Sequence, residues 1–221
     1  LRSKVKIGDA SDTHVSLGLA GNNAEMLAKK CFVAIPQSVL GAAHDESVTL
    51  IRLSPDRFQI ITPVEKAPAL WEKLSRSATA VGYQRWGWLN IRNGIPVITS
   101  ATQEQFVPQM LNMEIIGAVS FNKGCYPGQE VIARTQHLGM LKRRMYLANI
   151  RSENSPQPGE ELFSGDVQGQ ASGMIINAAA SPEGGYDVLA VIQIASAQTE
   201  VVHWKSLSGP ALKLLPLPYS V

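Results

Sequence analysis

The sequence has few cysteines and no histidine cluster, which excludes several common kinds of site. Cys31 and Cys125 are the two cysteines among 221 residues. That is too few for a disulfide framework or for a four-ligand zinc or iron–sulfur site within the chain. The four histidines are scattered without the spacing of metal ligands: His14, His44, His137 and His203. We therefore expect no bound metal and a reducing compartment.

The chain also lacks a strong charge imbalance and a long apolar run. Its 20 basic and 18 acidic side chains leave a net charge of +2, whereas direct binding of nucleic acid calls for a clustered basic surface. The apolar runs are too short to cross a bilayer, and the first residues have no apolar signal-peptide region. These features predict a cytoplasmic protein that binds neither nucleic acid nor a membrane. Because the sequence does not begin with methionine, we expect a segment to be missing in front of it.

The order of predicted elements indicates an α+β protein. Two-residue periodicity and turn residues predict strands over residues 4–7, 14–20, 49–53 and 57–62, with helices over 24–30 and 65–77. A short helix over 86–92 ends at Asn93-Gly94. It carries Trp86 and Trp88, which cannot share one helix face. Either both rings fill core space, or one of them offers a flat surface to a planar ligand.

Residues 100–112 are polar and predict a surface loop, although 106–111 are apolar enough to enter a groove.

From residue 142 onward the sequence pattern changes to short strands. Further on, strand-like runs over 144–150, 168–177, 186–194 and 200–204 alternate with glycine-containing turns. Short strands at that spacing predict a small antiparallel barrel. We place the domain boundary near residues 139–142.

The segment over residues 123–134 presents a thiol at a turn before a helix. Gly124 and Gly128 flank Cys125 and leave it accessible, and Pro127 suits the first position of a helix that would run to His137. A thiol beside Lys123 and a helix N-terminus has a lowered pKa and reacts readily. The opposite interpretation is a small buried hydrophobe, which is the one we assign to Cys31.

Other catalytic interpretations of the thiol are weaker. A Cys–His protease pair would need His137 or His203 beside Cys125. His137 lies about 18 Å further along the same predicted helix, so it could not reach the thiol. The sequence also has neither a Walker loop nor a Gly-x-Gly-x-x-Gly fingerprint.

The residues around the thiol resemble the signature of the YgfZ family. The match covers Lys123-Gly-Cys-Tyr-Pro-Gly-Gln-Glu130, Ala133-Arg134, Gly139 and Lys142-Arg143. Residues 89–98, 106–109, 117–121 and 215–220 agree with the same family. Its members are folate-binding proteins that support iron–sulfur enzymes and tRNA modification. The resemblance implies the α+β fold of aminomethyltransferases, with a C-terminal antiparallel β-barrel and a central hole for tetrahydrofolate.

The resemblance also assigns the parts and the residues of the site. Residues 1–140 would be the α+β folate-binding region and 141–221 the barrel of a monomer in the bacterial cytoplasm. Cys125 matches the family's required cysteine, and Trp86, rather than Trp88, matches a tryptophan implicated in folate contact. Gly128 matches the motif as well, and the other candidates for the folate site also come from it: Lys123, Tyr126, Gln129, Glu130 and Arg134. The family's N-terminal segment, with another tryptophan of the folate site, has no counterpart here, so we expect only part of the pocket.

Three functions follow as hypotheses. The first is a folate-dependent accessory protein that uses Cys125 to assemble or repair iron–sulfur clusters on client enzymes, including tRNA-modifying ones. The second is a tetrahydrofolate-dependent, aminomethyltransferase-like one-carbon transferase. The third is a plain binding module with an inert cysteine.

Overall fold

A computed structural model describes residues 4–124, 128–167 and 169–221. Contacts divide the chain into two compact units, Leu1–Val81 and Gly82–Val221, and each is described by itself. Residues 82–140 thus group with the C-terminal strands, while the boundary at 140/141 stays a prediction. No helix among the described residues is long and apolar enough to span a membrane.

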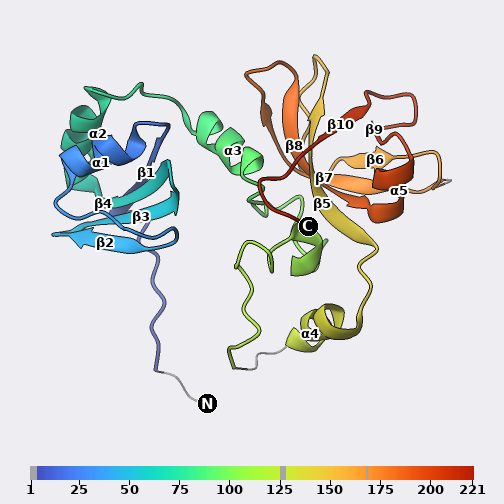
Figure 1. Ribbon diagram of the computed structural model, residues 1–221, viewed down its shortest axis with the longest axis horizontal. Helices are drawn as coiled ribbons and strands as arrows, with labels where there is room; N and C mark the ends of the chain where they lie inside the picture. Colours follow the sequence, from blue (N-terminus) through green and yellow to red (C-terminus); the bar gives the residue numbers. More distant parts are fainter. Residues whose placement is uncertain (1–3, 125–127, 168) are drawn as a thin grey trace. The chain divides into compact units, whose positions relative to one another are not determined.

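The first unit is an antiparallel sheet covered by helices. Its strands have the order β1-β4-β3-β2, and two helices pack on one side of them (Figure 1). Leu27 and Leu74 from the helices meet Leu50, Phe58 and Ile60 from the sheet, and all five are buried. The elements are β1 (His14–Ala20), α1 (Ala24–Cys31), β2 (Ala42–Asp45), β3 (Val48–Ser54), β4 (Arg57–Pro63), η1 (Val64–Lys66) and α2 (Ala67–Ser75).

The predictions for this unit were right except at two places. The strands over 14–20, 49–53 and 57–62 and both helices are confirmed. The strand over residues 4–7 is wrong: these residues are exposed and belong to no strand. β2 was missed because Ala42-Ala-His-Asp has neither a β-branched nor a large aromatic residue. It forms by pairing from Ala42↔Ile51 to Asp45↔Val48.

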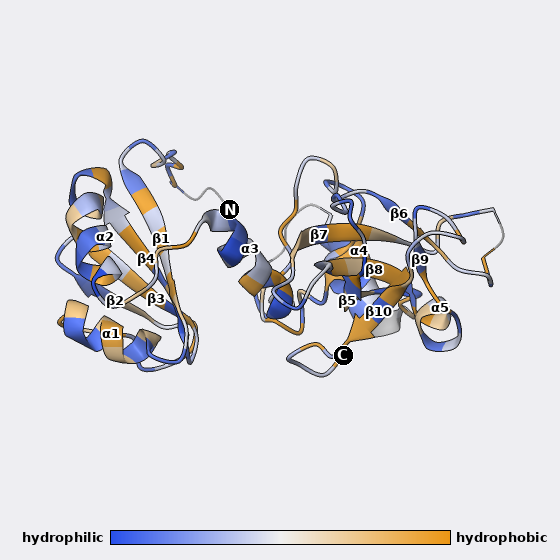
Figure 2. Cartoon of the chain, turned by 90° about the horizontal axis from the view of Figure 1, so that it is seen from above, coloured by the Kyte–Doolittle hydropathy of each residue, from blue (hydrophilic) through white to orange (hydrophobic). Residues whose placement is uncertain are grey.

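The second unit is built on a curled six-stranded antiparallel sheet. The strand order is β10-β5-β8-β7-β6-β9, and a bridge between His203 and Ala211 joins the two edges. The central strands β7 and β8 are apolar along much of their length (Figure 2), and Val188 to Ile192 are completely buried. The strands are β5 (Arg143–Ile150), β6 (Glu161–Phe163), β7 (Gly173–Ala180), β8 (Tyr186–Gln193), β9 (His203–Trp204) and β10 (Leu212–Leu215).

The predicted C-terminal barrel is therefore confirmed as a curled antiparallel sheet, with local differences. β5 and β8 match the predicted runs closely. β7 begins later than predicted, at Gly173, because Gly169 takes a left-handed turn conformation at φ 69°. The short strands β6 and β10 and helix α5 (Ile194–Thr199) were missed.

Among the residues that the structure describes, three helices lie between the first unit and the curled sheet in the sequence. They are α3 (Tyr83–Arg92), η2 (Pro108–Leu111) and α4 (Gln129–Leu138). The surface loop predicted over 100–112 holds for residues 100–105, which are exposed except for Thr102. It is wrong for 108–112, where η2 forms and Gln109, Leu111 and Asn112 are buried, and the apolar residues over 106–111 enter the core as predicted. The predicted α4 and its end at Gly139 are confirmed. The described helix begins at Gln129, and Pro127 lies outside the described residues.

Candidate functional site

The residues predicted from the thiol segment lie on and before α4. Cys125 and Tyr126 are outside the described residues. Lys123, Glu130 and Arg134 are exposed, and Gln129 is half-buried as the first residue of α4. Gly128 precedes the helix with a φ of 85°, a left-handed conformation that favours glycine. Glu130 in the first turn stabilises the positive end of the helix.

Trp86 lies on a different helix. α3 packs against β7 and β8, and it holds Trp86 and Trp88 half-buried. The structure thus gathers Gln129, Glu130 and Arg134 on one helix and places Trp86 on another.

α3 is held by a buried carboxylate. Asp187 at the start of β8 is 2% exposed. Its Oδ2 accepts a hydrogen bond from Trp88 Nε1 at 2.8 Å, and its Oδ1 accepts one from Asn149 Nδ2 at 2.8 Å. Arg92 lies 3.8 Å from the same Oδ2. Both carboxylate oxygens are paired, so this cluster holds Trp88, and with it α3, in place against the sheet.

A second polar cluster surrounds η2. Arg144 on β5 donates to Glu114 Oε1 at 2.8 Å and to the Gln109 carbonyl at 3.3 Å. Gln109 Nε2 donates to the Ile132 carbonyl of α4 at 2.6 Å, and Asn112 Nδ2 donates to the Met145 carbonyl at 3.0 Å. Gln109 lies on η2, and Asn112 is the residue that ends this helix, in a left-handed conformation with a φ of 58°.

This second cluster has acceptors without donors. Gln109 Oε1, Asn112 Oδ1 and Glu114 Oε2 are buried and have no hydrogen-bond partner. Unpaired buried polar atoms are rare in folded proteins, because each costs about 1–3 kcal/mol unless a ligand or a water completes it. The cluster, which we call the acceptor cluster (Gln109, Asn112, Glu114), therefore has three buried acceptors that a water or a ligand would complete.

The C-terminal segment reaches the acceptor cluster through Tyr219. The Tyr219 hydroxyl donates to the Gly94 carbonyl at 2.7 Å. Burial raises the pKa of this phenol, while the Asn112 side chain and the charge of Arg144 act in the opposite direction. The Tyr219 hydroxyl therefore lies within hydrogen-bond reach of the Asn112 side chain. Gly94 has a φ of 63°, and a Cβ there would collide with the tyrosine ring.

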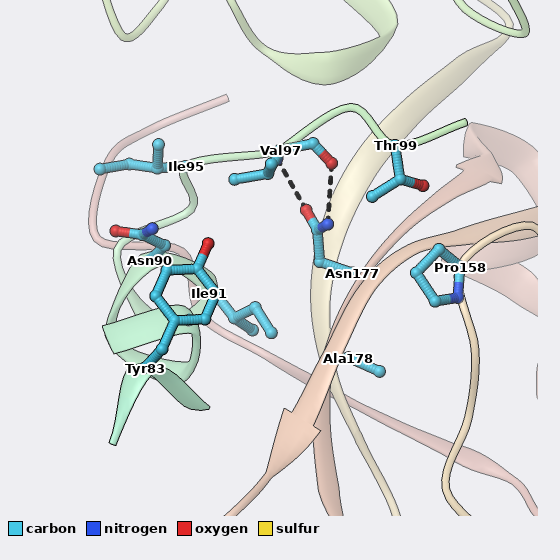
Figure 3. Close-up of a pocket in the computed structure, with 10 residues that line it drawn as sticks. Tyr83, Asn90, Ile91, Ile95, Val97, Thr99, Pro158, Asn177 and Ala178 are labelled. Carbon is cyan, nitrogen blue, oxygen red and sulfur yellow. Dashed lines mark hydrogen bonds between the residues drawn. The ribbon is translucent and has the colours of Figure 1, made fainter. Parts of the chain in front are cut away.

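A pocket of about 200 Å³ lies on another face of α3. Tyr83, Asn90 and Ile91 line it from the helix, facing the segment around Val97 (Figure 3). Asn177 holds that segment by accepting from the Val97 N–H and donating to its carbonyl, both at 2.8 Å. Ligand pockets usually measure about 300–1,000 Å³, so this one is too small for a whole folate.

The described residues contain no group of three or more His, Cys, Asp or Glu side chains placed to hold a metal ion. Cys31 is a free, half-buried thiol packed against the core of the first unit, as its interpretation as a small hydrophobe predicted.

The acceptor cluster and Asp187 were not among the predicted site residues. One signal was available: Gln109 and Asn112 are amides three residues apart within an otherwise apolar stretch, residues 106–113. That spacing indicates two polar groups on one face of a turn. No local pattern marks Asp187, since its partners Trp88 and Asn149 are distant in sequence.

Comparison with known proteins adds relatives of almost the whole chain. The chain is 35% identical over 216 residues to the tRNA-modifying protein YgfZ of Sodalis glossinidius (strain morsitans), covering 96% of this chain and 66% of that protein. It is 33% identical over 223 residues to the tRNA-modifying protein YgfZ of Klebsiella pneumoniae (strain 342), covering 99% and 67%. No family model matches.

The chain belongs to the YgfZ family. It spans about two thirds of the length of these two YgfZ relatives. Among solved structures, it resembles the glycine cleavage system aminomethyltransferase T from Bartonella henselae. The TM-score is 0.72 at 20% identity, over 93% of this chain and 59% of the other. That likeness confirms the predicted aminomethyltransferase-like fold.

Proposed function

We propose that this YgfZ-family chain is part of a folate-binding protein that supports assembly or repair of iron–sulfur clusters in client enzymes. The clients would include tRNA-modifying enzymes, in keeping with the name of its relatives. The observation that carries the folate part is the acceptor cluster. It offers unpaired acceptors beside α4, the helix of the thiol signature.

In this proposal the acceptor cluster would bind the edge of a reduced pterin. That edge carries adjacent N–H and amino donors, which complement a carboxylate and carboxamide oxygens. Arg144 fixes Glu114 by one oxygen, so Glu114 Oε2 is left to accept from a ligand. Gln109 Oε1 and Asn112 Oδ1 are the further acceptors. Tetrahydrofolate, when bound, would supply a one-carbon carrier at this place.

The residues predicted from the motif take supporting roles in this proposal. Lys123 and Arg134 are exposed cations suited to the carboxylate tail of a folate. The half-buried Trp86 would offer its ring to the planar part of the ligand. Gln129, Glu130 and Tyr126 complete the proposed set around the tetrahydrofolate.

Cys125 is the proposed functional thiol. A position near the positive end of α4 and the charge of Lys123 would favour its thiolate. The thiolate would act as a transient cluster ligand, a redox partner or an acceptor in folate chemistry. The protein would work in the bacterial cytoplasm as a monomer, in contact with client enzymes rather than with nucleic acid.

Complementation tests the proposal. A strain lacking this function would receive the full-length wild type, Cys125→Ala or the matched control Cys31→Ala. We expect wild type and Cys31→Ala to restore growth under oxidative stress, and Cys125→Ala to fail. Equal growth of all three would reject the thiol mechanism. The pH dependence of the alkylation rate would give the pKa of Cys125. A value near the free-thiol pKa of about 8.5 would support an inert cysteine instead.

Calorimetry of full-length protein with tetrahydrofolate tests the ligand separately. The aminomethyltransferase alternative predicts a further result: formation of methylene-tetrahydrofolate from an aminomethyl donor. Detection of that product would reject the accessory role and show that the protein is a one-carbon transferase.

A further inference from the structure

We propose that Gln109 is a positioning residue that couples occupancy of the acceptor cluster to the position of α4. This inference rests on the proposed folate binding. It assigns to one carboxamide the link between the ligand and the helix that follows the thiol signature.

The two ends of the Gln109 side chain serve different partners. Its Nε2 donates to the Ile132 carbonyl in the middle of α4 at 2.6 Å, whereas its Oε1 is buried without a donor. Gln109 is 1% exposed, so the carboxamide has little room to turn. A donor that binds Oε1 would fix the plane of the amide and would polarise the Nε2–H toward Ile132.

The base of Gln109 is itself rigid. Arg144 NH1 donates to the Gln109 carbonyl, and Asn112 ties the end of η2 to the Met145 carbonyl of β5. Leu111 on η2 is buried in the core with Met145 and Leu147 of β5. If the carboxamide of Gln109 changes its position, α4 therefore moves with it through the hydrogen bond to Ile132, whereas η2 stays in place.

α4 is the lightly held partner. Among its residues with described side chains, 129–136, none is buried, and Val131 is 59% exposed. The helix packs against η2 and stands apart from the curled sheet in Figure 1. An element with few buried contacts opens locally at low free energy, so one short hydrogen bond changes its stability measurably.

Hydrogen–deuterium exchange on the full-length protein tests the coupling, with 5-formyltetrahydrofolate as the probe. In the wild type, saturating probe should slow exchange of the α4 amides by at least about fivefold, because it stabilises the closed helix. Gln109→Met keeps the length of the side chain but removes both polar ends. It loses one acceptor of the proposed site and should bind the probe more weakly, through Glu114 and Asn112 alone. At a probe concentration that saturates the variant, α4 should no longer be protected.

Gln136→Met is the matched control, since it makes the same change at an exposed position of α4. It should retain the full protection by the probe. Gln109→Asn serves if the methionine variant does not fold: it keeps a carboxamide that is one methylene too short to reach both partners, so protection should again be lost.

The outcomes separate the two proposals. Equal protection of α4 in the wild type and in a folded Gln109 variant overturns the coupling, as does a wild type that binds the probe without protecting α4. A wild type that does not bind the probe overturns the proposed folate binding and the coupling with it.

Discussion

The two buried polar clusters of the second unit differ in how completely they are paired. Around Asp187, both carboxylate oxygens meet side-chain donors from α3 and β5. Around η2, three acceptors on Gln109, Asn112 and Glu114 meet none. A fully paired network stabilises one structure. Unpaired buried acceptors destabilise the fold, and a ligand that donates hydrogen bonds to them would remove that cost. The comparison therefore makes Asp187 and Trp88 part of the scaffold, whereas η2 carries acceptors of the proposed binding site.

The largest effect is expected at the paired cluster. Asp187→Leu leaves Trp88 Nε1 without its acceptor and removes one of the two acceptors of Asn149 Nδ2, which also donates to the Gly184 carbonyl at 3.2 Å. Breaking a buried charged network costs about 3–5 kcal/mol, and urea unfolding followed by circular dichroism would measure it. A loss below about 1 kcal/mol, the size of an ordinary surface effect, would contradict the scaffold role of Asp187.

The second prediction concerns binding by the unpaired cluster. Glu114→Leu removes the free Oε2 and should weaken 5-formyltetrahydrofolate binding about 10- to 100-fold, the loss expected for a hydrogen bond to a charged group. Isothermal titration calorimetry would show it. Glu153→Leu, at an exposed position of the same unit, is the control. Unchanged affinity in Glu114→Leu would mean that waters, not folate, complete the cluster.

The third prediction concerns the link made by the C-terminal segment. Tyr219→Phe removes the hydrogen bond to Gly94 and should cost about 1 kcal/mol. Because burial raises the pKa of Tyr219 above its ordinary value of 10.0, the neutral phenol stabilises the fold fully below pH 10. That contribution is lost as the pH rises through the raised pKa of the folded state.

Urea unfolding of the wild type and Tyr219→Phe at a series of pH values checks this. The difference between the two proteins should narrow above pH 10 and stay constant between pH 6 and pH 9. A constant difference throughout would show that Tyr219 contributes by packing alone.

The smallest effect is expected at an exposed pair in the first unit. Glu72 and Arg76 on and just after α2 are 2.9 Å apart, and both side chains are more than 70% exposed. Arg76→Ala should change the unfolding free energy by about 0.3–0.5 kcal/mol or less, and the change should vanish in 1 M salt. A cost above about 1 kcal/mol in low salt would show that exposure does not separate strong pairs from weak ones here.

The sequence was sufficient where the structure follows local rules. The two-residue period of His14–Ala20, the turn residues after Leu53 and the apolar strands β5 and β8 all predicted their elements, since burial on alternate sides leaves a direct trace in the sequence. The motif around residues 123–134 identified the family that the relatives confirm.

Tertiary contacts decided the rest. β2 exists because β3 offers it an edge, and Gln109 is buried because α4 and β5 both contact η2. Neither pattern can be read from a local window. The candidate site residues on the motif stay predictions. The acceptor cluster depends on the fold, because Arg144, which pairs with Glu114, lies 30 residues further along the chain.

The attachment of Asn112 to β5 has a consequence for aggregation. β8 pairs with β5 from Arg143 to Ile150, but β10 covers the other edge only from Leu147 to Ile150. The carboxamide of Asn112 occupies the Met145 carbonyl beyond the end of β10. An uncovered strand edge recruits strands from other molecules. The segment that carries the acceptor cluster therefore also closes the place where a second chain would add to the sheet.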